Sequence, residues 1–356
     1  MEWYTIPLFI VGLLCLIKGG DWFVDGASGI AKRFKIPEIL IGATVVSIGT
    51  TLPEVMVSAT SAVEGVGGIA FGNAIGSIIC NSALIAAIPI IVKPGKADRK
   101  SLIVPSAFFF GAAIFYSLIA YISGEFSRIT GIVLLAIFAI YMVLNVLLVK
   151  RSSKKALGET EGLELKENAE NWTGTETNEK SEITDTCTDV LPKKHFNKEL
   201  VMELVFIVIG AALIAVGARL LVDNATVIAT AIGMSEAIIG LTIVALGTSL
   251  PELVTAITAL VKGHGALSLG NVIGANLFNL ILVAGVSMTI SPFAVPQTDV
   301  LANGMLASLA IDIPVSFGVM LILVVPTLIR KKLSRVQGIA LLGVYIGYLV
   351  LRMVLV

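Results

Sequence analysis

The chain has 356 residues, of which 56% are hydrophobic and 14% charged, and its mean hydropathy is +0.95. Soluble domains carry about 25% charged residues, so this composition excludes an ordinary soluble globular protein. Lysine and arginine together number 25, as do aspartate and glutamate, so net charge favours neither nucleic acid nor an acidic partner. We therefore expect an all-α integral membrane protein.

Ten apolar segments are long enough to cross a membrane as helices, which takes about 20 residues each. They cover residues 4–23, 37–62, 68–92, 102–122, 129–149, 200–222, 235–261, 266–290, 304–329 and 336–355. No lysine or arginine precedes the first segment, so we expect a retained span there rather than a cleaved signal peptide.

The loops between these spans alternate in charge. Basic residues follow the first, third, fifth and ninth spans, whereas the intervening loops are mainly acidic, with Arg128 as the main exception. The basic clusters are Lys32, Arg33 and Lys35; Lys93, Lys96, Arg99 and Lys100; Lys150, Arg151, Lys154 and Lys155; and Arg330, Lys331, Lys332 and Arg335. Since cytoplasmic loops carry the excess of basic residues, both termini are predicted to lie outside a cell membrane that the chain crosses many times.

One long polar stretch, 150–198, separates two groups of five spans. It is rich in Glu, Thr, Lys and Asn and poor in apolar residues, so it is predicted to be a disordered cytoplasmic linker. The predicted organisation is a first five-helix half, 1–149, this linker, and a second five-helix half, 199–356.

The two halves match each other at a constant offset of 198 residues, from Gly12/Gly210 to Pro94/Pro292. GATVVSIGTTLPE at 42–54 meets GLTIVALGTSLPE at 240–252, and GNAIG at 72–76 meets GNVIG at 270–274. Each half holds an odd number of spans, so the copies cross the membrane in opposite senses. Inverted repeats are typical of secondary transporters, whose site lies near the midplane at the repeat interface.

Glu54 and Glu252 occupy matching places about midway along the second and seventh spans. A charged side chain there costs at least ~3 kcal/mol, so we expect each to face an interior cavity and to serve transport. The preceding residues, Pro53 and Pro251, are expected to break or kink their helices and to free backbone carbonyls one turn earlier.

The residues around the two glutamates supply further oxygen atoms. Hydroxyls come from Thr50, Thr51, Thr248 and Ser249. Carboxylate, hydroxyl and carbonyl oxygens suit a hard cation such as Ca2+ or Na+, and the lack of Cys and His argues against Zn2+ or Cu+. Two ionised glutamates balance one Ca2+ or two Na+, so competition for one carboxylate pair would couple the two ions.

Asparagines on the third and eighth spans form the other wall of this predicted site. For Asn81 and Asn279 we favour contact with a cation, whereas Asn73 and Asn271 fit cation contact and interhelical hydrogen bonding equally well. Gly72/Gly76 and Gly270/Gly274 are small-residue pairs that allow helices to approach closely.

The two Gly-Thr-(Thr/Ser)-Leu-Pro-Glu segments, each followed by Gly-Asn-x-x-Gly, resemble the alpha repeats of the sodium/calcium exchanger family, within the calcium:cation antiporters, prokaryotic type. The motifs would cover 42–86 and 240–284. The resemblance implies ten helices with discontinuous helices 2 and 7, and alternating access by sliding of spans 1 and 6 against a core. The implied ion ligands are Glu54, Glu252, Thr50, Thr248, Thr51, Ser249, Ser77, Asn81 and Asn279, with the carbonyls of Ser47 and Ala245.

Two residues depart from the family pattern. Position 275 is Ala where the family often has Ser, which removes one oxygen from a Na+ position. Position 279 is Asn where potassium-dependent relatives carry Asp, which lowers the charge of the site and argues against K+ co-transport.

The main interpretation is a Ca2+/Na+ antiporter and not an enzyme, with a Ca2+/H+ exchanger of the same fold as the alternative. A cation channel is less consistent with the inverted repeat, and an intramembrane hydrolase is disfavoured because the glutamates follow prolines in oxygen-rich breaks without a nucleophile–base set. We expect no cofactor beyond the transported Ca2+ and Na+, no nucleic acid, and no obligate protein partner besides the lipid bilayer.

Other charged residues in the spans carry weaker predictions. Lys18 and Asp21 are expected to pair along the first span or to reach the interface. Asp25 and Asp223 are expected to be solvated residues at helix ends, and Asp312 the start of the ninth helix.

Overall fold

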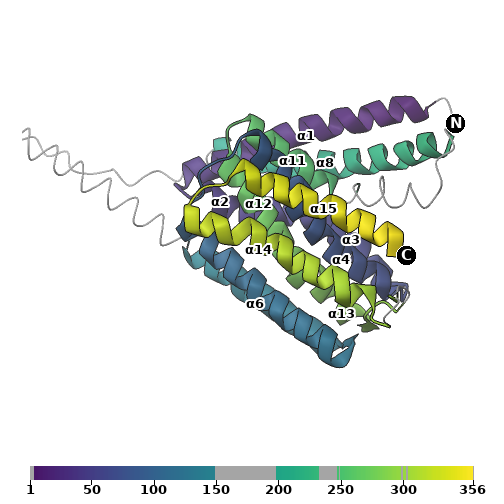
Figure 1. Cartoon of the computed structure of the whole chain (residues 1–356). Helices are drawn as coiled ribbons and strands as arrows, with labels where there is room; N and C mark the ends of the chain where they lie inside the picture. Colours follow the sequence, from purple (N-terminus) through teal and green to yellow (C-terminus); the bar gives the residue numbers. More distant parts are fainter. Residues whose placement is uncertain are drawn as a thin grey trace, which may run out of the picture.

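A computed structural model of the chain describes residues 4–148, 198–231, 247, 249–297, 300–301 and 304–355, and these are almost entirely helical (Figure 1). The first half comprises α1 Thr5–Arg33, α2 Glu38–Ile41, η1 Gly42–Val46, α3 Ser47–Val63, α4 Gly67–Cys80, η2 Asn81–Ile85, α5 Ala87–Val92, α6 Arg99–Ser123, β1 Glu125–Phe126 and the helix Arg128–Leu148. The second half comprises α8 Lys198–Ala231, α11 Leu250–Val261, α12 Gly265–Phe278, η4 Asn279–Val283, α13 Ala284–Ile290, β2 Phe293–Ala294, η5 Ser308–Asp312, α14 Ile313–Arg330 and α15 Arg335–Leu355.

Nine helices in the described part of the chain are long and apolar enough to span a membrane. They agree with nine of the ten predicted spans; of the seventh, 235–261, the structure describes Gly247 and the stretch from Ser249 onward, including α11. The largest differences are at the C-terminal ends of α1 and α8, which run about ten residues further than predicted. The predicted linker falls outside the described residues, apart from Lys198.

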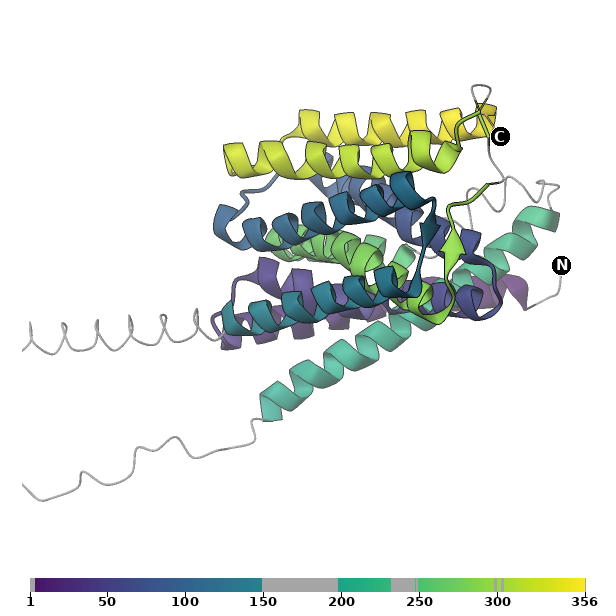
Figure 2. The ribbon, with the colours of Figure 1, turned by 90° about the horizontal axis from the view of Figure 1, so that it is seen from below.

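The helices form one bundle with two distinct ends. Both chain termini lie at the same end, and α8 begins at the opposite end (Figures 1 and 2). We call these the terminus end and the linker end. α14 and α15 lie side by side in both views, across the front of the bundle in Figure 1 and along its upper edge in Figure 2, and the α1/α8 pair lies away from them.

α1 and α8 contact each other along glycines that the internal repeat relates. A Cβ added at Gly12 would lie 3.0 Å from the carbonyl oxygen of Gly217, and one added at Gly19 would lie 2.8 Å from that of Gly210. Within the repeat Gly12 matches Gly210 and Gly19 matches Gly217, so the two contacts exchange under the repeat symmetry. These glycines let the two backbones touch, which is how small residues promote helix association in membranes.

The loops at the two ends of the bundle also pair reciprocally between the halves. At one end β1, in the loop after α6, pairs antiparallel with β2, in the loop after α13. At the other end Lys96, in the loop before α6, forms a bridge with Lys332, in the loop between α14 and α15. In each case the loop after the third helix of one half meets the loop after the fourth helix of the other, as two halves of opposite orientation require.

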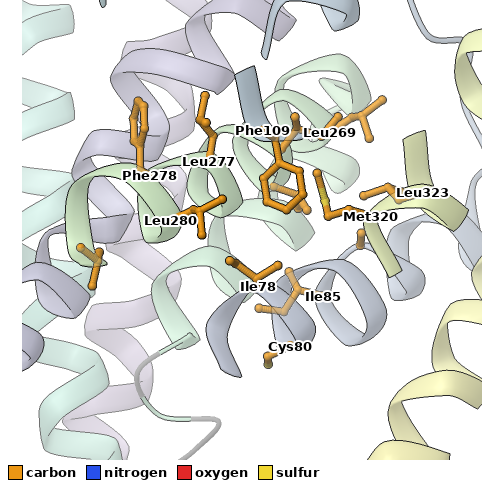
Figure 3. Packing of buried hydrophobic residues seen from close by; sticks show 14 of the residues in the cluster. Ile78, Cys80, Ile85, Phe109, Leu269, Leu277, Phe278, Leu280, Met320 and Leu323 are labelled. Carbon is orange, nitrogen blue, oxygen red and sulfur yellow. The ribbon is translucent and has the colours of Figure 1, made fainter. Parts of the chain in front are cut away.

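A buried core holds α12 at the centre of the bundle. Every α12 residue from Leu267 to Phe278 is buried. Figure 3 shows Ile78 of α4, Phe109 of α6 and Met320 of α14 packed around the end of α12 and the start of η4. Because lipid is as apolar as these side chains, the gain comes from close packing rather than from removal of water. The core therefore fixes the helices that carry the candidate site.

The predicted interruptions of helices 2 and 7 take different forms. The second span contains the π-helical segment η1 and continues into α3, with Pro53 inside the α-helix. In the seventh span α11 begins at Leu250, after the N-cap Ser249, and Pro251 lies in the first turn. Proline fits there because the first turn of a helix lacks N–H partners. The matched segments η2 and η4 are also π-helical, and each begins at an asparagine of the predicted site.

The close approach predicted for the small-residue pairs is observed in the second half. A Cβ at Gly274 would lie 2.6 Å from the Cα of Ala43, and one at Gly270 would meet the backbone of Ile39. No described residue lies within 4 Å of such an atom at Gly72 or Gly76. The segment that matches Ile39–Ala43, residues 237–241, falls outside the described residues.

The predictions for the other charged residues hold in part: Asp25 and Asp223 are solvated, with side chains 52% and 65% exposed, and Asp312 is the N-cap of α14. Asp21 pairs with Lys262 of α11, 241 positions away. Asp25 and Asp223 lie inside α1 and α8, because these helices continue beyond them. Asp312 is 6% exposed and accepts a hydrogen bond from Tyr348 of α15. Hydropathy cannot identify such contacts, which depend on helices distant in sequence.

Candidate ion-binding site

Glu54 and Glu252 lie together at the centre of the bundle. Each side chain is 0% exposed, and the two carboxylates are close enough to interact directly. Glu54 comes from the middle of α3 and Glu252 from the first turn of α11, where the N-terminal helix dipole favours a negative charge. Two ionised carboxylates in such a site repel each other, and a cation between them would relieve the repulsion.

Several polar atoms of this pair and of the other predicted ligands are buried and have no hydrogen-bond partner in the described part of the chain. A buried polar atom without a partner costs free energy, so a cluster of them is characteristic of a binding site. These atoms are both carboxylate oxygens of Glu54 and Glu252, the hydroxyls of Thr51 and Ser249, and the side-chain amides of Asn81 and Asn279. All of these residues were predicted as ligands.

Thr50 and Ser47 are held in place from the opposite repeat. The Thr50 hydroxyl donates to the Oδ1 atom of Asn271 at 3.3 Å, and the Ser47 hydroxyl lies 3.0 Å from the Asn271 carbonyl oxygen. The Ser47 hydroxyl also lies 2.7 Å from the carbonyl oxygen of Gly42, at the start of η1. Thr50 additionally lies beside the Glu252 carboxylate. These contacts join α3 to α12 at the site.

Asn73 has a different role from its repeat mate Asn271. Its amide donates to the backbone carbonyl of Glu54 at 3.1 Å and to the Ser58 hydroxyl at 2.7 Å. Asn73 therefore makes the interhelical hydrogen bonds that the sequence left open. The amide nitrogen of Asn271 is buried and has no partner among the described residues. Repeat-related positions thus carry unequal hydrogen bonding around the two glutamates.

The remaining predicted ligands fall into two groups. Ser77 is 4% exposed and lies one turn before Asn81 on α4. Thr248 and Ala245 fall outside the described residues, so their contribution stays a prediction. One neighbour was not predicted: Cys80, at the end of α4, lies next to Ser249 and near both glutamates. The sequence could have indicated Cys80, because it directly precedes Asn81, a predicted ligand of the site.

The chemistry of this set is that of a hard-cation site. It combines two carboxylates with neutral hydroxyl and amide oxygens, the ligands that Ca2+ and Na+ use in proteins. Among the described residues no group of three or more His, Cys, Asp or Glu side chains comes together.

Comparison with known proteins gives a consistent assignment. The sequence profile of the sodium/calcium exchanger protein family matches residues 4–147 and 202–354. A putative antiporter CaxA from Alkalimonas amylolytica is 34% identical over 346 residues, which is 95% of either chain. An uncharacterised membrane protein from Methanocaldococcus jannaschii is 41% identical over 140 residues, which is 38% of this chain and 44% of that protein.

The structure also resembles a solved one. The sodium-calcium exchanger NCX_Mj, in a crystal soaked with 10 mM Na+ and 10 mM Sr2+, superposes with a TM-score of 0.72 at 31% identity, covering 97% of each chain. This likeness confirms the predicted fold class, an all-α membrane protein built from two inverted repeats.

Proposed function

The chain belongs to the sodium/calcium exchanger protein family, a family of transporters and not of enzymes, and we propose that it exchanges Ca2+ for Na+ by alternating access at the Glu54/Glu252 site. The observation that carries the proposal is the meeting of two fully buried carboxylates from opposite repeats. They are surrounded by hydroxyl and amide atoms that lack partners in the described part of the chain.

This arrangement supports exchange because one site serves both ions. One Ca2+ or two Na+ neutralise the two carboxylates, so the ions compete and cannot bind together there. In an inverted-repeat transporter, one bundle moves against the other around a fixed midplane site, which opens the site to each side in turn. The tightly joined α1/α8 pair is the moving unit that we propose, and α3, α4, α11 and α12 are the fixed core.

We further propose that the terminus end of the bundle faces outward and the linker end faces the cytoplasm. The basic loops support this orientation. Lys93, Lys96 and Lys332 lie in loops that the Lys96–Lys332 bridge joins at the linker end, and basic loops favour the cytoplasmic side. A labelling experiment with a membrane-impermeant reagent on cysteines placed at either end in intact cells tests it.

The functional test is 45Ca2+ uptake into proteoliposomes preloaded with Na+, with K+- and choline-loaded vesicles as controls. We expect uptake that requires internal Na+ and disappears in Glu54→Gln. Glu125→Gln, the same chemical change at an exposed position of β1, should leave uptake at the wild-type level.

The outcomes separate the alternatives. Uptake driven by a proton gradient without Na+ would replace the proposal with Ca2+/H+ exchange, the second candidate of the same fold. Uptake indifferent to every counter-ion would contradict exchange altogether and leave a channel.

A further inference from the structure

A partly exposed cluster of charges joins α1 to α11 at the linker end. The ammonium group of Lys262 lies 2.8 Å from Oδ1 of Asp25 and 3.4 Å from Oδ1 of Asp21, and it donates to the Asp21 carbonyl oxygen at 2.9 Å. The Lys262 side chain is 25% exposed, so this ion pair is only partly solvated. None of these residues belongs to the site around Glu54 and Glu252.

The helices are also closely packed at this end. A Cβ added at Gly20 of α1 would lie 2.7 Å from Cγ1 of Val254 and 2.9 Å from the hydroxyl of Thr258, both on α11. The interface between the α1/α8 pair and the core is therefore closed at the linker end.

The repeat-related interface, between α8 and α3, is open. The residues that match Gly20 and Val254 are Ala218 and Met56, and both line a cavity of about 910 Å3 between α8 and α3. Gly49 and Pro53 of α3 line the same cavity, and Pro53 directly precedes Glu54. The α1/α11 interface is thus closed in this structure, whereas the repeat-related α8/α3 interface is open.

Two of the three charged residues at the closed interface have repeat mates of opposite sign at the open one, whereas the third, Asp25, matches Asp223. Lys262 matches Glu64, and Asp21 matches Arg219. At the closed interface the core helix carries the cation and α1 the carboxylate, whereas at the open interface the core helix carries the carboxylate and α8 the cation. Because both residues change sign, Glu64 and Arg219 carry opposite charges just as Lys262 and Asp21 do. The two interfaces therefore share a possible ion pair although their residue types differ.

Glu64 and Lys262 also have the same backbone setting. Each is the C-cap of its helix, and its N–H bonds to the carbonyl four residues earlier, at 3.0 Å in both cases. Each is followed by a glycine with positive φ, 76° at Gly65 and 83° at Gly263. Glu64 is exposed and makes no ion pair within the described residues, and Arg219, 85% exposed, lies 3.7 Å from Asp223 on its own helix.

We propose that these residues are two alternating gate latches: Lys262 with Asp21 and Asp25 closes the linker end, and Glu64 with Arg219 closes the terminus end in the opposite state. The proposal rests on the proposed alternating access of the α1/α8 pair. If α8 moved against α3 until their interface matched the present α1/α11 interface, Arg219 would lie beside Glu64. This is the arrangement that Asp21 and Lys262 now have. Each state would then lose one latch and form the other, so neither state is favoured strongly and exchange continues in both directions.

The latches are tested by the accessibility of a cysteine in the open cavity, an assay that needs no ion transport. In a background that lacks the native cysteines, Met56→Cys, at a cavity position whose native side chain is 66% exposed, reports the terminus-open state by its rate of reaction with a membrane-impermeant maleimide. We expect Lys262→Gln to lower this rate about threefold, since loss of one partly exposed ion pair favours the other state. Lys100→Gln, at an exposed lysine in the first turn of α6, is the matched control, and Ser123→Cys gives the rate at a site that stays exposed.

The second latch is tested by charge reversal. Glu64→Arg and Arg219→Glu should each raise the labelling rate of Met56→Cys and slow 45Ca2+ exchange, and the double variant should restore both. An unchanged labelling rate in Lys262→Gln would contradict the proposed latches, and so would additive effects of the two charge reversals. Either result would do so even if the wild-type protein shows Na+-dependent uptake. If the labelling rates shift as expected but the wild-type protein shows no exchange, the result would instead contradict the proposed function.

Discussion

Gly19 of α1 lies directly against Gly210 of α8, such that a Cβ added to either residue would come within 2.8 Å of the carbonyl oxygen of the other. The second glycine contact, Gly12 to Gly217, is its image under the internal repeat. Near the linker end Arg33 adds an ion pair to Glu203 at 2.9 Å. The two helices are thus joined along their length, and side chains larger than glycine cannot enter the joint without separating it.

The first prediction concerns this joint. Gly19→Val is expected to lower the free energy of unfolding by about 1–3 kcal/mol, because backbone atoms of α8 cannot move aside for the added methyl groups. Thermal unfolding in detergent measures the change. Gly343→Val, on an exposed face of α15 where no described residue lies within 4 Å, is the control and should cost far less. Equal losses in the two variants would contradict a special role for the joint.

The second prediction concerns Asn271, which holds Thr50 and Ser47 beside the carboxylates. Asn271→Ala should raise the Ca2+ concentration for half-maximal uptake about tenfold or more, the usual effect of removing a residue that orients a metal ligand. Asn145→Ala, which removes a buried asparagine bonded to the Tyr141 carbonyl, should leave that concentration unchanged. A loss of folded protein without a change in apparent affinity would indicate a purely structural role for Asn271.

The third prediction concerns the charge of the site. Asn279→Asp would place a third carboxylate near Glu54 and Glu252, so Ca2+ should bind several-fold more tightly while Na+-driven release becomes slower. Equilibrium 45Ca2+ binding in detergent and uptake by proteoliposomes measure the two effects. Asn279→Ala removes the oxygen without adding charge and should weaken Ca2+ binding. Tighter binding in both variants would exclude the amide as a ligand.

The fourth prediction concerns the start of α6, outside the membrane-spanning part. Burial alone would raise the pKa of Asp98, but hydrogen bonds from the Ser101 hydroxyl and from the N–H groups of Lys100 and Ser101 lower it below the ordinary 3.8. Asp98→Ala removes this N-cap and should cost about 1 kcal/mol at pH 7. Because the folded-state pKa is lowered, the wild-type advantage is present above about pH 3.8 and should shrink as the pH falls below that value. Thermal unfolding at pH 7 and at pH 3 checks it, and an advantage that is independent of pH would contradict it.

Much of the fold follows from hydropathy and from the self-match at offset 198. The predicted bounds of most spans agree with the observed helices within a few residues. α1 and α8 were predicted too short because polar residues such as Asp25 and Asp223 interrupt the apolar pattern before each helix ends. In the structure these residues lie on faces that meet lysine or solvent, so the helix continues through them.

The site was predictable where the sequence itself supplies the chemistry. Glu54, Thr51 and Asn81 were identified because buried polar residues repeat in register with those of the other half. The ion pair of Asp21 and the hydrogen bond from Thr50 to Asn271 could not be predicted, since both depend on how two helices from different halves are placed in space. No local pattern distinguishes Lys262 from an ordinary lysine at a helix end.

The reciprocal pairing of loops at the two ends has a consequence for how such a chain arose. The loop after the third helix of each half meets the loop after the fourth helix of the other, which is the self-complementary contact of a two-fold symmetric dimer. A five-helix ancestor that inserted in both orientations would make these contacts with a second copy of itself, before any linker joined the two. Two halves joined in one chain need not stay identical, and the opposite charges of Glu64 and Lys262 at matching positions are one such difference.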